Sequence, residues 1–212
     1  MIDEFYWRRA VVFGSVVLYW AGVSVNAAWV RQRIGRSPNL KPRGTRERLL
    51  WGGWFLVITV WLLQPLVIGN GGAVPGFLRP LPVLFHPVGL ILGVVLTVAG
   101  YAGTLWCYAA MGASWRIGID RREKNPLVAH GPYSLVRHPI YLFQIVMLFG
   151  ALLLLPGVLS VVALAVHVAC VLVKASDEEA YMLAVHGQDY RNYCSRSGML
   201  LPNLGGNRRD TP

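Results

Sequence analysis

The sequence predicts an all-α integral membrane protein: a bundle of about five transmembrane helices with a cytoplasmic helical cap at its C-terminal end. Hydrophobic residues make up 55% of the 212-residue chain and charged residues 14%, with mean hydropathy +0.47, which is too apolar for a soluble domain of this size. Five apolar runs follow one another, each near the ~20 residues that cross a bilayer. Basic residues gather in alternate connections between these runs, which is the pattern of the positive-inside rule.

The first two apolar runs predict helices over 5–30 and 49–68. The first run is too long for the apolar core of a signal peptide and lacks a small-residue cleavage site, so we expect it to remain as a helix. The connection between them is strongly basic and should be cytoplasmic. Its basic residues are Arg31, Arg33, Arg36, Lys41, Arg43, Arg46 and Arg48, against the single acid Glu47.

A third helix is predicted over 87–111, after a Gly/Pro-rich connection in which Arg79 is the only strong charge. That connection should lie on the opposite side of the membrane. The third helix carries a face of small residues, Gly89, Gly93, Gly100 and Gly103. Such a face lets another helix approach closely, within one chain or in a homodimer, so both a monomer and a homodimer are open.

The last apolar sequence, 139–173, predicts a helical hairpin. Pro156-Gly157 divides it into two pieces of about 17 residues, near the lower limit for spanning a membrane. The polar sequences before and after the hairpin should both be cytoplasmic, with the N-terminus outside, in what we expect to be the cell inner membrane. An amphipathic helix is predicted over 175–193, with an interruption or end near Gly187. We expect one domain over 1–202, with a catalytic half over 112–202, and a disordered tail over 203–212.

Composition argues against two other classes of function. The net charge of +10 comes from residues that flank apolar runs, so membrane topology explains it better than nucleic-acid binding. The three cysteines, Cys107, Cys170 and Cys194, are widely spaced without a C-x-x-C pair. They predict neither a disulfide framework nor a metal site.

Two polar segments should meet in space at the cytoplasmic side, namely 125–141 and 174–193. A helical hairpin returns the chain to the face it left, so segments at its two ends become neighbours. Together they offer cations, carboxylates, an imidazole and aromatic hydroxyls. We therefore predict a polar pocket at the membrane edge that suits a charged cofactor.

These two segments also resemble a known family. The sequence G-P-Y-S-L-V-R-H-P-I-Y at 131–141 is followed by the apolar hairpin and then by D-E-E-A-Y-M-L-A-V-H-G-Q-D-Y-R-N-Y at 177–193. Over roughly 112–202 the chain is similar to the isoprenylcysteine carboxyl methyltransferase and phospholipid methyltransferase superfamily. The resemblance implies an enzyme that transfers a methyl group from S-adenosylmethionine to a lipophilic acceptor.

Carried onto this chain, the resemblance implies a cofactor site formed by the following residues: Asn125, Pro126, Leu127, Val128, Tyr133, His138, Pro139, Ile140, Tyr141, Glu178 and Glu179. It implies an acceptor-binding role for Lys174, and we also predict catalytic roles for Arg137 and Glu178. Asn125 stands where histidine is common in the family, and Lys174 stands where arginine contacts the substrate. A lysine keeps the charge but lacks the bidentate fork that suits a carboxylate.

The residue types fit this chemistry. Arg137 or His138 suits the cofactor's carboxylate, Glu178 or Glu179 suits its ammonium or ribose, and tyrosine rings attract its sulfonium. The acceptor is expected to be an isoprenylcysteine-like carboxylate or another lipid-like molecule that arrives from the bilayer. Two alternatives stay open at this point: a membrane reductase of the sterol reductase type that uses NADPH, and a non-catalytic scaffold.

Overall fold

The computed structural model describes residues 2–39, 42, 44–68, 81, 85–118 and 126–203. Helices dominate these ranges, and the only extended pairings within them are two isolated parallel bridges. The six α-helices are α1 (Ile2–Ile34), α2 (Gly44–Val67), α3 (Pro87–Met111), α4 (Pro139–Leu154), α5 (Val158–His186) and α6 (Gln188–Arg196). Two short 3-10 turns, η3 (Gly112–Ser114) and η4 (Gly131–Ser134), lie between α3 and α4 in sequence.

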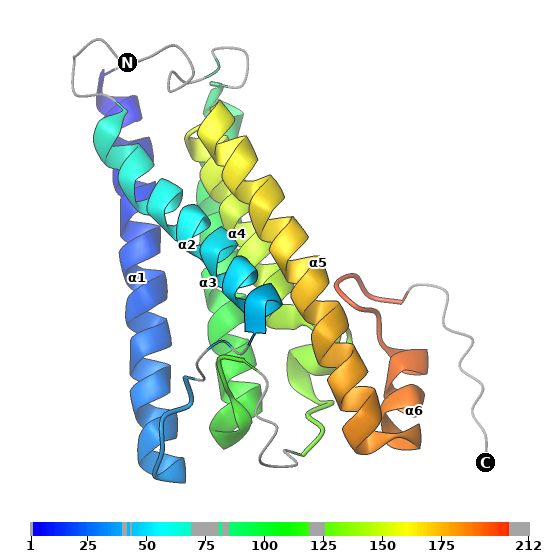
Figure 1. Cartoon of the computed structure of the whole chain (residues 1–212). Helices are drawn as coiled ribbons and strands as arrows, with labels where there is room; N and C mark the ends of the chain where they lie inside the picture. The colour runs from blue at the N-terminus through cyan, green and yellow to red at the C-terminus, as the bar shows by residue number, and fades with distance from the viewer. Residues whose placement is uncertain are drawn as a thin grey trace.

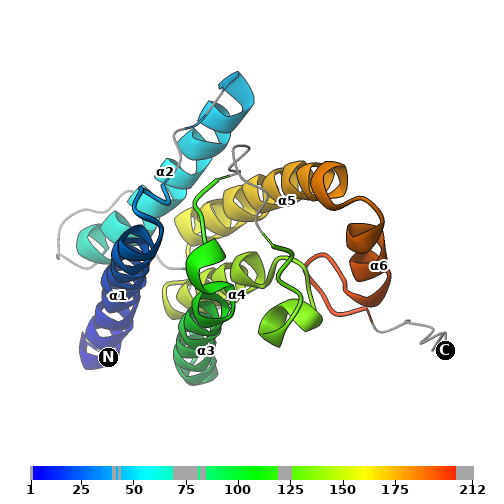
Figure 2. The same cartoon turned by 90° about the horizontal axis from the view of Figure 1, so that it is seen from below.

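The first five α-helices run up and down in one bundle, with α2 lying across it at an angle (Figure 1). We call the end where α1 begins and α4 ends the upper end, and the end where α1 ends and α6 lies the lower end. Seen from below, α6 packs beside α5 on the side away from α1 and α2 (Figure 2). The start of α1 and the end of α5 therefore lie at opposite ends of the bundle.

Four helices, α1, α2, α3 and α5, are long and apolar enough to cross a membrane, and α4 is a shorter apolar helix of 16 residues. Many of their large apolar side chains face outward, including Phe55 at 72% and Ile91 at 65% exposed. Such faces suit contact with lipid. The predicted all-α membrane bundle is confirmed.

The boundaries of α3 agree with the prediction, whereas α5 is longer than predicted. The hairpin does turn at Pro156-Gly157, but α5 continues to His186 and is 29 residues long. Nothing breaks the helix after Val173, because the polar residues that follow still form helical hydrogen bonds. Gly187, at φ +53°, ends α5 and separates it from α6, so the predicted break there is confirmed. The amphipathic helix predicted over 175–193 is thus the end of α5 plus most of α6. Of the predicted disordered tail, only Asn203 lies within the described residues.

The small-residue face of α3 packs against α4. A Cβ at Gly100 would lie 2.6 Å from the carbonyl oxygen of Phe143, and one at Gly103 would lie 2.3 Å from the Phe143 ring. A Cβ at Gly93 would lie 2.7 Å from Leu154. Glycine is required at these three positions, where α4 crosses α3 closely within the chain.

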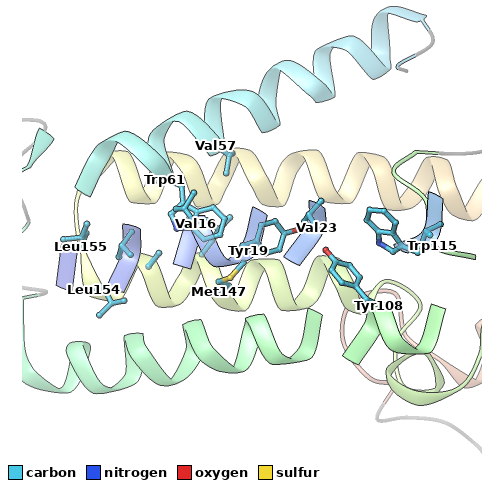
Figure 3. Close-up of a cluster of buried hydrophobic side chains, with 14 residues drawn as sticks. Val16, Tyr19, Val23, Val57, Trp61, Tyr108, Trp115, Met147, Leu154 and Leu155 are labelled. Atoms are coloured by element: carbon cyan, nitrogen blue, oxygen red, sulfur yellow. The ribbon is translucent and has the colours of Figure 1, made fainter. Parts of the chain in front are cut away.

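The core lies between α1, α2 and α4 (Figure 3). Val16, Tyr19 and Val23 enter it from α1, Val57 and Trp61 enter from α2, and Met147 and Leu154 enter from α4. The Tyr19 and Trp61 rings contact each other at 5.7 Å between centroids. This core fixes α1 and α2 against the hairpin that carries the polar motifs.

Arg8 joins α1 to the upper end of the bundle, a role that the sequence analysis did not predict. Its side chain is fully buried and donates to Glu4 and to the carbonyls of His86, Leu153 and Leu154. The last two carbonyls are at the C-terminal end of α4, where a cation is favourable. Arg8 therefore caps α4 and ties it to α1.

Candidate functional site

The lower end brings the two polar segments together, as the predicted hairpin requires. The chain before α4 also pairs with the chain after α6 through a parallel bridge between Val136 and Gly198. The Arg137 amide donates to the Gly198 carbonyl at 2.8 Å, and the His138 amide donates to the Met199 carbonyl at 3.1 Å. We call residues 197–199 the C-terminal strap. It fixes the backbone from which Arg137 and His138 project.

Arg137 links three elements at this end. Its Nε lies 2.7 Å from Glu179 Oε1 on α5, and its Nη1 donates to the carbonyls of Cys194 in α6 and Ser197 in the C-terminal strap. Its side chain is 12% exposed, so these are shielded, charge-assisted hydrogen bonds. Arg137 is therefore held in a fixed position and in turn holds the Glu179 carboxylate.

His138, Tyr141 and Glu178 form a second group beside Arg137. The Tyr141 hydroxyl donates to Glu178 Oε1 at 2.9 Å, and His138 Nδ1 lies 3.4 Å from Glu178 Oε2. The His138 ring stacks on the Tyr141 ring with centroids 5.7 Å apart. His138 Nε2 lies 3.4 Å from Glu179 Oε1 but lacks hydrogen-bond geometry, so this buried nitrogen has no hydrogen-bond partner.

The electrostatics favour the protonated form of His138. Burial, the largest influence, lowers the pKa of the imidazole, but the nearby carboxylates of Glu178 and Glu179 together outweigh it. The net result is a pKa above the ordinary value of 6.5. For Arg137, too, burial lowers the pKa, and the Glu179 carboxylate raises it by more. The site therefore presents the Arg137 guanidinium, and an imidazole whose pKa is raised, among two carboxylates.

The remaining predicted cofactor residues surround this group to different degrees. Tyr133 is buried at the end of η4; its carbonyl accepts a 2.6 Å hydrogen bond from the Tyr193 hydroxyl, and burial raises the pKa of its own phenol. Pro139 is fully buried at the first position of α4, and Ile140 packs against the core. Leu127 and Val128 are half-buried and Pro126 is exposed. Asn125 lies outside the described residues.

Lys174 lies one helical turn before Glu178 on α5 and faces α2. Its side chain is 8% exposed, and its Nζ is 3.8 Å from Glu47 Oε1. A second pair, Arg46 with Asp177 at 3.0 Å, joins the same two helices. The start of α2 therefore belongs to the surroundings of the site, a placement that the sequence motifs did not predict.

A groove of about 340 Å³ opens between α5 and α6 at the lower end. Its lining residues are Glu179, Ala180, Leu183, Tyr190, Arg191 and Cys194. Glu179 is 21% exposed and contacts both Arg137 and this groove, so the carboxylate is reachable from solvent. No cluster of three or more metal-ligating side chains occurs in the described ranges.

Sequence reasoning missed the C-terminal strap, Tyr193 and Glu47. The strap acts through backbone amides, which carry no side-chain signature. Tyr193 belongs to the second motif, but an interfacial position explained it equally well before its bond to Tyr133 was visible. Glu47 is the single acid in a basic loop, and its presence there could have indicated a specific cationic partner, which the structure shows to be Lys174.

The comparison with protein families agrees with this geometry. Residues 92–184 match the model of the isoprenylcysteine carboxyl methyltransferase family. The matched segment contains α4 and nearly all of α3 and α5, with Arg137, His138, Glu178 and Glu179 inside it. The resemblance to this family is confirmed over the matched residues, which include the first motif and residues 177–184 of the second. Glu47, Tyr193 and the C-terminal strap lie outside the match.

Two bacterial proteins are also similar to the chain over 160 residues. It is 28% identical to the cobalt-zinc-cadmium resistance protein CzcN of Cupriavidus metallidurans, covering 76% of this chain and 66% of that protein. It is 24% identical to the nickel-cobalt-cadmium resistance protein NccN of Alcaligenes xylosoxydans xylosoxydans, covering 76% of this chain and 67% of that protein. The chain therefore spans just under two thirds of the length of the first relative.

Proposed function

We propose that this protein is an integral membrane methyltransferase that uses S-adenosylmethionine and methylates a lipophilic acceptor. The observation that carries the proposal is the convergence of Arg137, His138 and Tyr141 with Glu178 and Glu179 at the lower end. These residues come from two motifs on either side of a hairpin, and the family match covers the first motif and residues 177–184 of the second. The reductase and scaffold alternatives have no comparable support.

The side chains present fit the groups of S-adenosylmethionine. His138 Nε2 is a buried donor without a hydrogen-bond partner, beside a pair of carboxylates, and suits the cofactor's carboxylate. Glu178 and Glu179 suit its ammonium or ribose hydroxyls, and the faces of Tyr133 and Tyr141 suit its sulfonium. Asn125, Pro126, Leu127 and Val128 would line one edge of the site, and Pro139 and Ile140 the base of α4.

The cofactor supplies an activated methyl group, and the chain supplies position and shielding. Methyl transfer is an in-line displacement, so alignment of acceptor and methyl contributes most to the rate. Tyr141 fixes the Glu178 carboxylate, and Arg137 fixes the Glu179 carboxylate and the C-terminal strap. Because Nε and Nη1 of Arg137 are engaged by these partners, we assign it a positioning role and assign contact with the cofactor to His138 and Glu178. Burial of Tyr133 and Pro139 keeps water out of this region.

We propose that an acceptor of lipid-like character reaches this site from the bilayer between helices, near Lys174. The acceptor class includes isoprenylcysteine-like carboxylates and other lipophilic molecules. The basic residues at the lower end support a cytoplasmic position for it, with the N-terminus outside, and we propose the inner membrane as its location. Residues 1–202 then act as one methyltransferase domain. The names of the two relatives concern metal resistance and specify no methyl acceptor.

Two variants test the site. We expect His138→Ala and Glu178→Gln to weaken S-adenosylmethionine binding about tenfold or more, since each removes a charge-assisted contact. Asp177→Asn is the matched control: it changes the neighbouring acid, which pairs with Arg46 instead. Calorimetric titration of detergent-purified protein measures all three. If both site variants bind the cofactor as tightly as the control in folded protein, the assignment is wrong.

A further inference from the structure

The chain between η4 and α4 carries two residues of the candidate site but belongs to no helix. It comprises residues 135–138. Peptide groups outside helices need partners from other segments, because an unpaired buried N–H or C=O is costly. The C-terminal strap supplies three such bonds. Its Gly198 amide donates to the Leu135 carbonyl at 3.3 Å, and its carbonyls accept from the amides of Arg137 and His138. The strap therefore holds this segment where no helix does.

The strap itself is fixed at both of its sides. A Cβ at Gly198 would lie 1.7 Å from the Leu201 carbonyl oxygen, so the chain folds back here too closely for any side chain. Ser197, the preceding residue, is 1% exposed, and its hydroxyl donates to the Tyr193 carbonyl at 2.7 Å. The strap is thus tied to α6.

Tyr193 makes a second link from α6 to the first motif. Its side chain is buried, and its hydroxyl donates to the Tyr133 carbonyl at 2.6 Å. This bond fixes η4, the turn that carries the Tyr133 ring. Burial raises the pKa of the Tyr133 phenol most, and the neighbouring Glu178 carboxylate also raises it, which agrees with a position of the ring beside the site.

The two links end on different parts of the site. The C-terminal strap holds the backbone of His138, to which the proposed function assigns the carboxylate of the cofactor. Tyr193 holds Tyr133, whose ring face suits the sulfonium. S-adenosylmethionine and S-adenosylhomocysteine share the carboxylate, the ribose and the adenine, but only the first carries a sulfonium. The two ligands therefore report separately on the two links.

We propose that Tyr193 is a positioning residue of the methyltransferase site, which sets the Tyr133 ring against the sulfonium of the cofactor, and that the C-terminal strap positions His138 against its carboxylate. This inference rests on the proposed function and deepens it. Tyr193 and the strap both act through the first motif, and both lie beyond the family match, which ends at residue 184. The end of α6 and the strap then form part of the functional unit.

Tyr193→Phe removes the hydroxyl and keeps the ring. Calorimetric titration of the full chain in detergent with S-adenosylmethionine and with S-adenosylhomocysteine measures its effect. We expect the affinity for S-adenosylmethionine to fall about 3- to 10-fold, because the hydrogen bond that places the Tyr133 ring is lost, and the affinity for S-adenosylhomocysteine to fall less. A purely structural role would lower the thermal midpoint without changing the ratio of the two affinities.

Tyr190→Phe is the matched control. Tyr190 is as buried as Tyr193 on the same helix, each at 4% exposed, but it lines the groove beside Glu179. This variant leaves the bond between Tyr193 and Tyr133 in place, so it should leave the ratio of affinities unchanged. Gly198→Ala should displace the strap and weaken both ligands by similar factors of about tenfold, because both carry the carboxylate.

Several outcomes would overturn the proposal. Equal weakening of the two ligands in Tyr193→Phe, or no weakening, contradicts the role of Tyr193, and so does the same change of ratio in Tyr190→Phe. Unchanged affinities in Gly198→Ala contradict the role of the strap. If this variant does not fold, Ser197→Ala takes its place, with a smaller loss expected for both ligands. If the original chain binds neither ligand, the proposed function fails as well, and titration of that chain distinguishes this case from the others.

Discussion

The two ends of the bundle each contain a buried arginine with the same kind of partners. Arg8 at the upper end donates to Glu4 and to three backbone carbonyls. Arg137 at the lower end donates to Glu179 and to two backbone carbonyls. Each is a guanidinium whose charge is balanced by one glutamate and whose remaining donors join separate segments of the chain.

The surroundings of the two arginines differ. Arg8 packs over the Phe85 ring at 4.2 Å and caps the end of α4, so its contacts account for its burial. Arg137 adjoins His138, whose Nε2 lies 3.4 Å from Glu179 without a hydrogen bond, and through Glu179 it adjoins the groove between α5 and α6. A buried arginine by itself therefore indicates packing; unpaired donors and paired acids beside it indicate a binding site.

The largest expected effect is a loss of stability when Arg8 is replaced. Arg8→Leu leaves Glu4 and three carbonyls without their donor, and we expect a loss of about 3 kcal/mol in the free energy of unfolding. Denaturant titration in detergent measures this. Arg9→Leu, which changes a neighbouring half-buried arginine, should cost clearly less. Cofactor affinity of the folded Arg8→Leu fraction should match that of the original chain; a weaker affinity would place Arg8 in the functional machinery.

Arg137 should show a mixed effect. Arg137→Lys keeps the charge but cannot reach Glu179, Cys194 and Ser197 at once, because an ammonium lacks the guanidinium fork. We expect S-adenosylmethionine affinity to fall about tenfold, through misplacement of Glu179 and the C-terminal strap, together with a lower thermal midpoint. Calorimetry and a thermal scan on the same sample separate the two. Loss of stability with full cofactor affinity would make Arg137 equivalent to Arg8.

A substitution at Lys174 tests whether this residue belongs to the acceptor site or to the cofactor site. Lys174→Ala should raise the acceptor KM more than it changes cofactor affinity, because Lys174 faces Glu47 at the start of α2 rather than the His138 group. We expect about a 3- to 10-fold change in KM, measured as transfer of a labelled methyl group to a lipophilic acceptor that the protein methylates. The opposite pattern, with cofactor affinity more affected, would move Lys174 into the cofactor site.

The smallest expected effect is a pH dependence of the thermal midpoint that comes from His138 at the lower end. Arg8 at the upper end should contribute no such dependence. The pKa of His138 is raised above 6.5 in the folded chain, so the imidazolium stabilises the fold. This contribution is complete below the unfolded pKa and is lost as pH rises through the folded pKa. The thermal midpoint of the original chain should therefore exceed that of His138→Gln most at pH below about 6.5 and less at higher pH. A difference that grows with pH would contradict the charge assignment.

Parts of the architecture could be predicted because the sequence contains explicit signals. The α3 boundaries match the prediction: Pro87 occupies the first turn, the His86 side chain accepts from the Val88 amide, and Gly112 ends the helix. The end of α5 was not predictable from hydropathy, since the fall in hydropathy at Lys174 indicates where a helix leaves the membrane and not where it stops. Arg8 was missed because an arginine near the end of an apolar run has the appearance of an ordinary interfacial charge.

The candidate site, too, could be predicted only in part. The predicted turn at Pro156-Gly157 returns the chain to the face it left, so the prediction that His138 and Tyr141 lie near Glu178 is confirmed. The pairing of Gly198 with Val136 and the approach of Glu47 to Lys174 depend on how separate segments pack. No periodicity or motif in a single sequence specifies those contacts.

The most direct test of the central claim is calorimetric titration of the original chain with S-adenosylmethionine and S-adenosylhomocysteine, with NADPH as the comparison. The account predicts saturable binding of both adenosyl compounds, weakened by His138→Ala, and no binding of NADPH. Binding of NADPH alone would contradict the methyltransferase assignment and favour a reductase, and binding of none of the three would leave the lower end without a cofactor.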